Sequence, residues 1–183
     1  YIEWLIPLIN KKTGKIHTNY NQIVTSTWRL SSTNPNLQNI PSSVGIAWEI
    51  RWAFIPESEN NILIAADYSQ VEIRVLAIMS KDENLLNAFK NDIDIHYNTA
   101  KLIFGKNEIN KDERRIAKSV NFWVIYWISP FWLAKMLNIS QKDAKLYIEK
   151  FFENYPRVKS FFEELIKKAD EYWSMETIFS RKR

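Results

Sequence analysis

The second half of the chain is dominated by hydrophobic residues that recur every three or four positions, a spacing typical of amphipathic α-helices. This pattern begins at Val71 and continues almost to the C-terminus. Charged residues, glycine or proline interrupt it near Lys81, at residues 92–94, 105–110 and 129–130, and at Pro156. The pattern therefore predicts a layer of several helices.

The last two predicted helices have the clearest end signals. Ser140 followed by Asp143 resembles a capping box at the start of the first one. The helix after Pro156 should stop near residue 173, where glycine is the usual residue because it adopts the left-handed conformation at little cost. Trp173 occupies that position instead. The apolar stripes of these two helices are Ala144, Tyr147, Ile148, Phe151 and Phe152, and Val158, Phe161, Phe162, Leu165, Ile166 and Ala169.

The first part of the chain has shorter and more varied patterns. Residues 1–9 predict a helix, and a turn at Gly14 leads into an alternation that predicts a strand. Residues 31–41, rich in serine, asparagine and proline, predict a loop. The apolar run at residues 62–66 predicts a short buried strand that ends at Asp67. We expect a helix-rich α+β fold, with a short mixed sheet followed by the helical layer.

Composition narrows the class of protein. A length of 183 residues fits one domain or parts of two, and 46% hydrophobic with 25% charged residues is typical of soluble proteins. The chain starts at Tyr1 without methionine and ends on the basic run SRKR, so we expect a fragment of a longer protein. The absence of cysteine excludes disulfides and thiolate metal sites. A net charge of +4 mildly favours a polyanionic partner.

Glycine is unusually scarce and tryptophan unusually common. Average usage would give about 13 glycines in a chain of this length, but the sequence has 3, together with 8 tryptophans. Trp123, Trp127 and Trp132 lie within ten positions of one another.

Asp67 has two interpretations. A carboxylate at the edge of a sheet suits Mg²⁺, which prefers hard oxygen ligands and often shares them with substrate phosphates. Asp67 is also well placed to cap the helix that begins a few residues later. Spacing alone favours the cap.

Residues 112–127 predict a helix with two different sides. One side can face a core through Ile116, Ala117, Val120 and Val124. The other side carries two cations and then two aromatic residues at successive steps of four, namely Arg114, Lys118, Phe122 and Tyr126, with Arg115 nearby. Such a stripe could hold phosphates at one end and stack a base or sugar at the other. Periodicity alone favours a solvated basic face.

Two further sets of polar residues are candidates for binding. Arg29, Asn36, Gln38 and Asn39 offer donors to a nucleic-acid backbone or minor groove, although a polar loop also uses such side chains to bond its own backbone. His96 could donate to a phosphate, although a lone helical histidine is more often structural.

Together these segments resemble the family A DNA polymerases, the bacterial DNA polymerase I type. DYSQVEIR at residues 67–74 resembles motif A of that family. RRIAKSVNFWVIYW at residues 114–127 resembles motif B on the fingers helix, usually written RRxxKxxNFGxxYG. TWRLSSTNPNLQNIP at residues 27–41 resembles the segment TGRLSSxxPNLQNIP. The resemblance covers essentially the whole chain in order, and motifs A and B together are highly specific.

The resemblance implies a nucleotidyltransferase of DNA replication and repair, which joins a deoxynucleoside triphosphate (dNTP) to a primer 3′-hydroxyl with the help of two Mg²⁺ ions. It implies a partial palm at residues 1–80, helical fingers at 81–172 and the start of a return to the palm at 173–183. Its partners would be primer–template DNA and dNTPs. We expect a cytoplasmic monomer without membrane contact.

The resemblance also implies roles for individual residues. Asp67 would be one of two metal-binding aspartates, with the Tyr68 carbonyl as a further ligand, and Lys118 would assist catalysis. The dNTP would be bound by Gln70, Glu72, His96, Arg114, Lys118, Phe122 and Tyr126, among which Glu72 would exclude a ribose 2′-hydroxyl. The DNA duplex would be contacted by Arg29, Asn36, Gln38 and Asn39.

One departure from the family concerns catalysis. Motif C, which carries the second catalytic aspartate in a His-Asp-Glu segment, is absent from these residues, so we expect the 183 residues alone to be inactive. A second class of function therefore stays open, a non-catalytic helical nucleic-acid-binding module derived from the same fold. A helical protein-interaction domain would explain the amphipathic helices but not DYSQVEIR.

The other departure concerns tryptophan. Trp28, Trp123 and Trp127 stand where the family's best-known motifs have glycine, and Trp4, Trp132 and Trp173 stand where many members have it. Trp48 and Trp52 are less constrained. We hypothesise that one codon, written here as tryptophan, is read as glycine in the source organism. The intact mass of the native protein tests this hypothesis.

Overall fold

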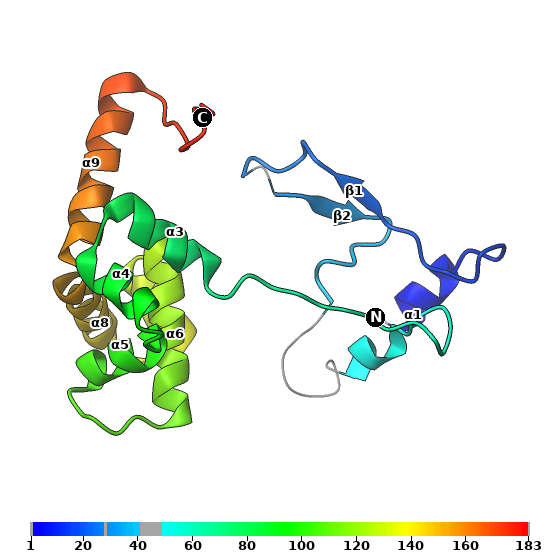
Figure 1. The fold of residues 1–183 in the computed structure, drawn as a ribbon, viewed down its shortest axis with the longest axis horizontal. Helices are drawn as coiled ribbons and strands as arrows, with labels where there is room; N and C mark the ends of the chain where they lie inside the picture. The colour runs from blue at the N-terminus through cyan, green and yellow to red at the C-terminus, as the bar shows by residue number, and fades with distance from the viewer. Residues whose placement is uncertain (1, 28, 41–48, 183) are drawn as a thin grey trace. The chain divides into compact units, whose positions relative to one another are not determined.

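The computed structural model describes residues 2–27, 29–40 and 49–182, which form two compact units divided between Ala66 and Asp67 (Figure 1). Trp28, Trp48 and part of the segment at residues 27–41 lie outside the described residues. The predicted palm and fingers boundaries stay predictions, because a division into compact units does not by itself define subdomains.

The first unit contains short elements: α1 (Ile2–Leu5), the 3₁₀ helix η1 (Ile6–Leu8), β1 (Asn19–Asn21), β2 (Ser31–Thr33) and the 3₁₀ helix η2 (Ile50–Ala53). The strands β1 and β2 pair antiparallel, with Asn19 opposite Thr33. The helix predicted at residues 1–9 is confirmed as one α-helical turn followed by a 3₁₀ turn. The strand predicted after Gly14 is also confirmed, although it has only three residues.

Two predictions in this unit are wrong. Ser31–Thr33 form a strand rather than a loop, because the buried Ser32 hydroxyl lies 2.6 Å from the Thr18 hydroxyl and so joins two polar segments. Residues 62–66 form no strand, and Ile62, Leu63 and Ile64 are 65–82% exposed. A strand needs a neighbour for its backbone hydrogen bonds, and within the described ranges β1 and β2 pair only with each other.

The second unit is a bundle of seven helices in the part of the chain that the structure describes (Figure 1). The helices are α3 (Val71–Ser80), α4 (Glu83–Lys90), α5 (Ile95–Phe104), α6 (Lys111–Ile125), α7 (Pro130–Leu137), α8 (Gln141–Asn154) and α9 (Pro156–Tyr172). They end at the interruptions that the sequence predicts. None of the described helices is both long and apolar enough to cross a bilayer. The helix-rich α+β prediction is confirmed.

Local capping explains where several helices begin. The Ser140 side chain accepts from the Asp143 amide at the start of α8, as the sequence predicts. Asn110 and Glu113 form a full capping box at the start of α6. The Asp82 carboxylate accepts from an amide of α4 through one oxygen and from the Arg157 amide in α9 through the other, and so ties the two helix starts together.

The core of the bundle fixes the orientation of α6. Ala117, Val120 and Val124 are at most 2% exposed and pack inward. Side chains from the other six helices of the bundle complete this core, and they include Leu85, Ile95, Leu133 and Phe151. Burial of each such side chain stabilises the fold by roughly 1.5–3 kcal/mol. Because this burial fixes one side of α6 against the core, the opposite side of the helix faces solvent.

The tryptophan side chains are more exposed than is typical, because tryptophan is usually largely buried. All six in the described ranges are at least 37% exposed. Trp127 and Trp173 have φ angles of 59° and 50°, in the left-handed region that favours glycine. This geometry supports the glycine hypothesis, because backbone and exposure both fit a residue without a side chain.

We expect Trp173→Gly to stabilise the protein. Trp173 is 92% exposed and ends α9 in the left-handed conformation, so glycine removes strain without removing packing. The free energy of unfolding should rise by about 1 kcal/mol, as measured by urea denaturation. Trp132→Gly is the matched control, because Trp132 is exposed inside α7 and glycine should lower stability there by about 0.5–1 kcal/mol. A loss of stability in both variants would contradict this expectation.

Candidate functional site

The loop before α3 presents the motif A residues to solvent. Asp67 is exposed, Tyr68 is 83% exposed, and the N-cap of α3 is Gln70, so the interpretation of Asp67 as a helix cap is wrong. Arg74 holds this loop from inside α3, because its Nε donates to the Ser69 carbonyl at 3.1 Å. Its guanidinium also lies 4.4 Å from the centre of the Phe89 ring. The Asp67 carboxylate is therefore not used to start the helix.

A side-chain hydrogen bond joins this region to the end of α6. The Tyr126 hydroxyl donates to Oε1 of Glu72 at 3.2 Å, across 54 positions of sequence. Tyr126 is the C-cap of α6, and Glu72 lies in the first turn of α3. The two motifs that the sequence analysis singled out therefore meet within one compact unit.

The stripe on α6 lies on the solvent side, as periodicity predicts. Arg114, Lys118, Phe122 and Tyr126 are all exposed, whereas the buried residues of α6 lie on its other side. The Phe122 and Tyr126 rings are 5.1 Å apart between centroids. We call these four residues the α6 stripe.

Arg114 already has an anionic partner in this structure. Its Nε lies 2.8 Å from Oδ2 of Asp94, the residue that caps the start of α5. Partial burial acts to raise the pKa of Asp94, but hydrogen bonds from Arg114 and from the Tyr97 amide outweigh it, so the pKa of Asp94 lies below its ordinary value. An incoming anion must compete with this ionised carboxylate for Arg114.

His96 is buried between α5, α6 and the motif A loop. Its Nδ1 lies 3.0 Å from Nδ2 of Asn121, and its Nε2 lies 3.3 Å from Nε2 of Gln70. Burial lowers the pKa of His96; the Asp94 charge opposes this, and the charges of Arg114 and Lys118 lower it further. The imidazole is therefore neutral near pH 7.

Sequence reasoning did not select Asn121 or Asp94. Asn121 is 1% exposed and lies on the apolar side of α6 next to Val120 and Val124. A polar side chain inside an otherwise apolar helix face is the signal that would have found it, because a buried amide needs hydrogen-bond partners. Asp94 carries an ordinary N-cap signal that does not reveal its ion pair with Arg114.

The four predicted DNA-contact residues belong to the first unit. Arg29, Gln38 and Asn39 are exposed, and Asn36 is half-buried. Oδ1 of Asn36 accepts from the Gln38 amide at 3.0 Å, as in a loop that bonds its own backbone. Arg29 precedes β2, whereas Asn36, Gln38 and Asn39 follow it.

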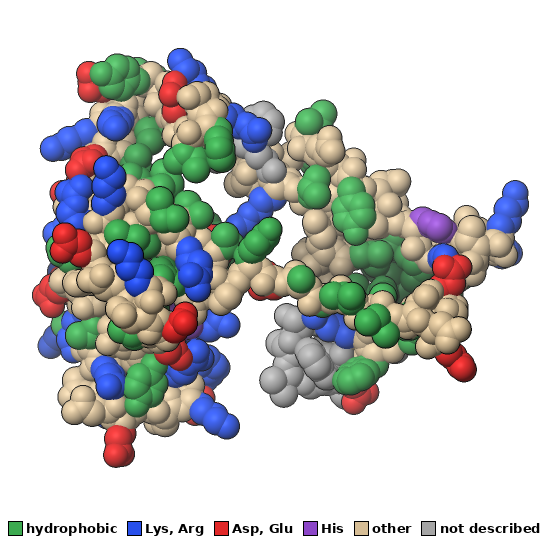
Figure 2. Space-filling view, in the orientation of Figure 1, with side chains coloured by type: hydrophobic (Ala, Val, Ile, Leu, Met, Phe, Trp, Pro, Cys, Tyr) green, Lys and Arg blue, Asp and Glu red, His purple; other side chains and the backbone are tan. Residues whose placement is uncertain are grey.

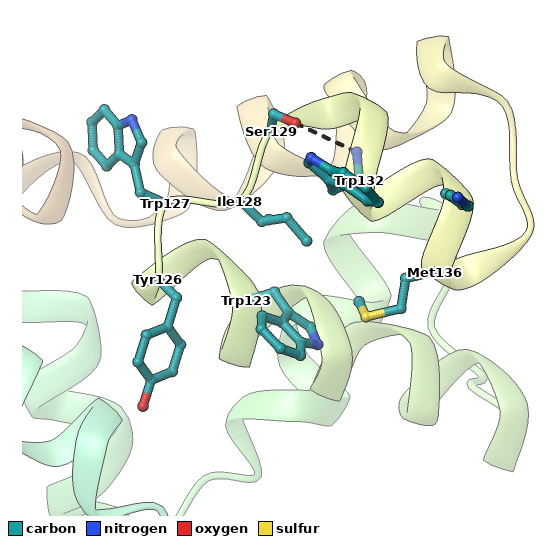
Figure 3. A pocket seen from close by; sticks show the side chains of 8 residues that line it. Trp123, Tyr126, Trp127, Ile128, Ser129, Trp132 and Met136 are labelled. Atoms are coloured by element: carbon teal, nitrogen blue, oxygen red, sulfur yellow. Dashed lines mark hydrogen bonds between the residues drawn. The ribbon is translucent and has the colours of Figure 1, made fainter. Parts of the chain in front are cut away.

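A pocket of about 750 Å³ lies beside the end of the α6 stripe (Figure 3). Tyr126 lines this pocket and also belongs to the stripe. Figure 3 shows Ser129 at the start of α7, where its hydroxyl accepts from the Trp132 amide at 3.4 Å. Three of the eight lining residues are Trp123, Trp127 and Trp132, so glycine at these positions would strip most of the aromatic lining.

A metal ion at Asp67 would need ligands from a substrate. No group of three or more histidine or acidic side chains is gathered to hold a metal within residues 2–27, 29–40 and 49–182. Asp67 and the Tyr68 carbonyl do supply hard oxygens on an exposed loop, which suits Mg²⁺ because this ion is often held by one or two carboxylates together with substrate phosphates. These two groups could supply part of the ligand set of such an ion.

Figure 2 shows lysine and arginine side chains spread over the visible face of the helical unit, interspersed with acidic ones. Two further cations carry acidic partners, because Arg115 pairs with Asp112 at 3.2 Å and Lys106 pairs with Glu113 at 2.6 Å. The structure pairs Lys118 with no acidic side chain among the described residues.

Comparisons with known proteins agree with these motifs. The profile of DNA polymerase family A matches residues 1–183. DNA polymerase I of Bacillus caldotenax is 45% identical over 185 residues, which cover 100% of this chain and 21% of the relative. DNA polymerase I of Streptococcus pneumoniae serotype 4 is 48% identical over 173 residues, which cover 93% of this chain and 20% of the relative. The chain thus spans about a fifth of the length of these curated relatives.

A solved structure shares the fold. It is described as the POL domain of Pol1 from M. smegmatis in complex with DNA primer-template and dNTP, and it matches with a TM-score of 0.86 at 33% identity. The match covers 100% of this chain and 32% of that chain. The chain belongs to DNA polymerase family A.

Proposed function

We propose that this chain supplies the fingers and part of the palm for template-directed DNA synthesis. The observation that carries the proposal is the hydrogen bond between Tyr126 and Glu72, which joins the motif A loop to the α6 stripe. The acidic side chains of motif A and the two cations and two aromatic rings of the α6 stripe therefore belong to one compact unit. The relatives named DNA polymerase I, and the related structure described with primer-template and dNTP, support the same function.

The α6 stripe is suited to bind a dNTP along its length. Lys118 and Arg114 would hold the triphosphate and offset the negative charge that develops during nucleotidyl transfer. Phe122 would pack against the sugar, and Tyr126 would lie beside the templating base. Binding would require Arg114 to exchange its Asp94 partner for a phosphate oxygen.

The motif A loop would position the reacting groups. Asp67 and the Tyr68 carbonyl would hold Mg²⁺, which when bound supplies charge stabilisation for the attacking and leaving oxygens. Glu72, fixed by Tyr126, would occupy the space that a ribose 2′-hydroxyl needs. Gln70 would lie near the nascent base pair, and His96 would donate to the triphosphate.

The remaining assignments extend the proposal to the whole chain. Arg29, Asn36, Gln38 and Asn39 would contact the primer–template duplex from a palm portion at residues 1–80, and the fingers would occupy residues 81–172. The protein would work in the cytoplasm as a monomer. The alternative function, a non-catalytic nucleic-acid-binding module, has no need for a dNTP site on α6.

Photoaffinity labelling with an azido-dNTP separates the two functions. We expect the intact native protein to be labelled within residues 114–127 and unlabelled dNTP to compete. Arg114→Ala should reduce labelling severalfold because it removes a phosphate contact. Arg115→Ala is the matched control, since Arg115 lies beside Arg114 and pairs with Asp112. Labelling spread over other helices, or unaffected by competitor, would contradict the proposal.

A further inference from the structure

Three side chains from distant positions form a chain of polar contacts, in which two members are buried and the third is half-buried. Asn121 on α6 contacts His96 on α5, and His96 contacts Gln70 on the loop before α3. His96 and Asn121 are 4% and 1% exposed, so water does not compete freely for their hydrogen bonds. Gln70 has a left-handed backbone with φ of 53°, an uncommon conformation for a residue other than glycine.

The contact with Asn121 decides where the histidine proton lies. The Asn121 atom that faces the ring is Nδ2, 3.0 Å from Nδ1 of His96, and an amide nitrogen only donates hydrogen bonds. The amide nitrogen of Gln70 faces the other ring nitrogen, and a neutral ring accepts at one nitrogen only, so one of the two amides has to turn. Gln70 is half-buried on a loop, whereas Asn121 is 1% exposed, so Gln70 is the amide that turns more easily. Nδ1 then accepts from Asn121, and the proton of the neutral ring lies on Nε2. Oδ1 of Asn121 is buried without a hydrogen-bond partner among the described residues, so the amide has its one side-chain contact at His96.

We propose that Asn121 is a positioning residue that holds His96 in the tautomer with its proton on Nε2. The proton then faces the Gln70 amide, whose oxygen accepts it once the amide group turns by 180°. A phosphate oxygen replaces that acceptor when a dNTP binds. This last step rests on the proposed function, whereas the tautomer itself does not.

The charged groups around His96 are consistent with a neutral donor. Asp94 caps the helix that carries His96, and the charges of Arg114 and Lys118 act on the ring from α6. A protonated imidazole would add a third positive charge beside these two cations in a buried position. A neutral ring with an Nε2 proton can donate to a phosphate without placing a further positive charge in this buried position.

Two-bond ¹H–¹⁵N correlation spectra of the full chain test the proposal, because they distinguish imidazole tautomers. The chain has two histidines, and His17 is exposed, so His17→Gln assigns the spectrum. We expect the pattern of a neutral ring protonated on Nε2. Asn121→Asp should move the proton to Nδ1, where the new carboxylate accepts it, and raise the pKa of His96. Asn121→Leu, similar in volume, should give averaged tautomers.

Ser119→Asp is the matched control, because it adds the same charge on α6 at a residue whose hydroxyl bonds the Arg115 carbonyl; it should leave the tautomer unchanged. A wild-type ring protonated on Nδ1, or an Asn121→Asp spectrum without a tautomer change, would overturn the proposal. In the intact native protein, Asn121→Asp should weaken dNTP binding about tenfold with DNA binding unchanged. If the tautomer changes but dNTP affinity does not, the role of Asn121 stands and the phosphate role of His96 fails.

Discussion

Asp67→Asn should reduce nucleotide incorporation by the intact native protein by roughly 10³-fold or more, with little change in DNA affinity. Asparagine keeps the size of the side chain but removes the negative charge that a metal ion needs. The structure gives Asp67 no capping role in α3, so the substitution should not disturb folding. Single-turnover primer extension measures the rate, and urea denaturation measures the stability.

Asp170→Asn controls for the loss of one carboxylate, because Asp170 is an exposed residue on α9. Incorporation should stay within about twofold of wild type in this variant, since isolated surface substitutions have small effects. Near-normal incorporation by Asp67→Asn would remove Asp67 from the catalytic centre.

Lys118→Ala should lower the rate of incorporation by about 10²–10³-fold, the loss that follows removal of one group that stabilises charge in the transition state. Lys118 lies at the middle of the α6 stripe, one turn from Arg114 and one from Phe122. Its exposure and position on the solvent side of α6 make a large effect on folding unexpected. Rates at several dNTP concentrations separate weaker binding from slower chemistry.

Lys145→Ala is the control for Lys118, because Lys145 is an exposed lysine on α8 whose partner, Glu149, is on the same helix. Its incorporation rate should match that of wild type. Equal losses in both variants would show that general positive charge, rather than the α6 stripe, supports nucleotide incorporation.

Helical periodicity predicted the parts of the structure that depend on local residues. The breaks between helices and the two sides of α6 follow from the sequence, because burying one side of an amphipathic helix leaves the other in solvent. The exposure of the α6 stripe could be predicted without knowing which helices pack beside α6. The same reasoning failed at residues 62–66, because a strand depends on a partner strand that the periodicity of a single segment cannot supply.

The site contacts between distant segments were beyond sequence reasoning. The bonds from Tyr126 to Glu72 and from Asn121 to His96 join residues 54 and 25 positions apart. Each depends on how α3, α5 and α6 pack, which no local pattern records. The ion pair of Arg114 with Asp94 also joins two segments that are distant in sequence. Arg114 would have to break this ion pair before it could bind a phosphate.

The most direct test of the account is template-directed incorporation by the intact native protein, measured with a primer–template, one dNTP at a time and Mg²⁺. The account predicts that the dNTP complementary to the template base is added to the primer and that the other three are added far more slowly. A protein that binds the primer–template but extends it with none of the four dNTPs would contradict the account.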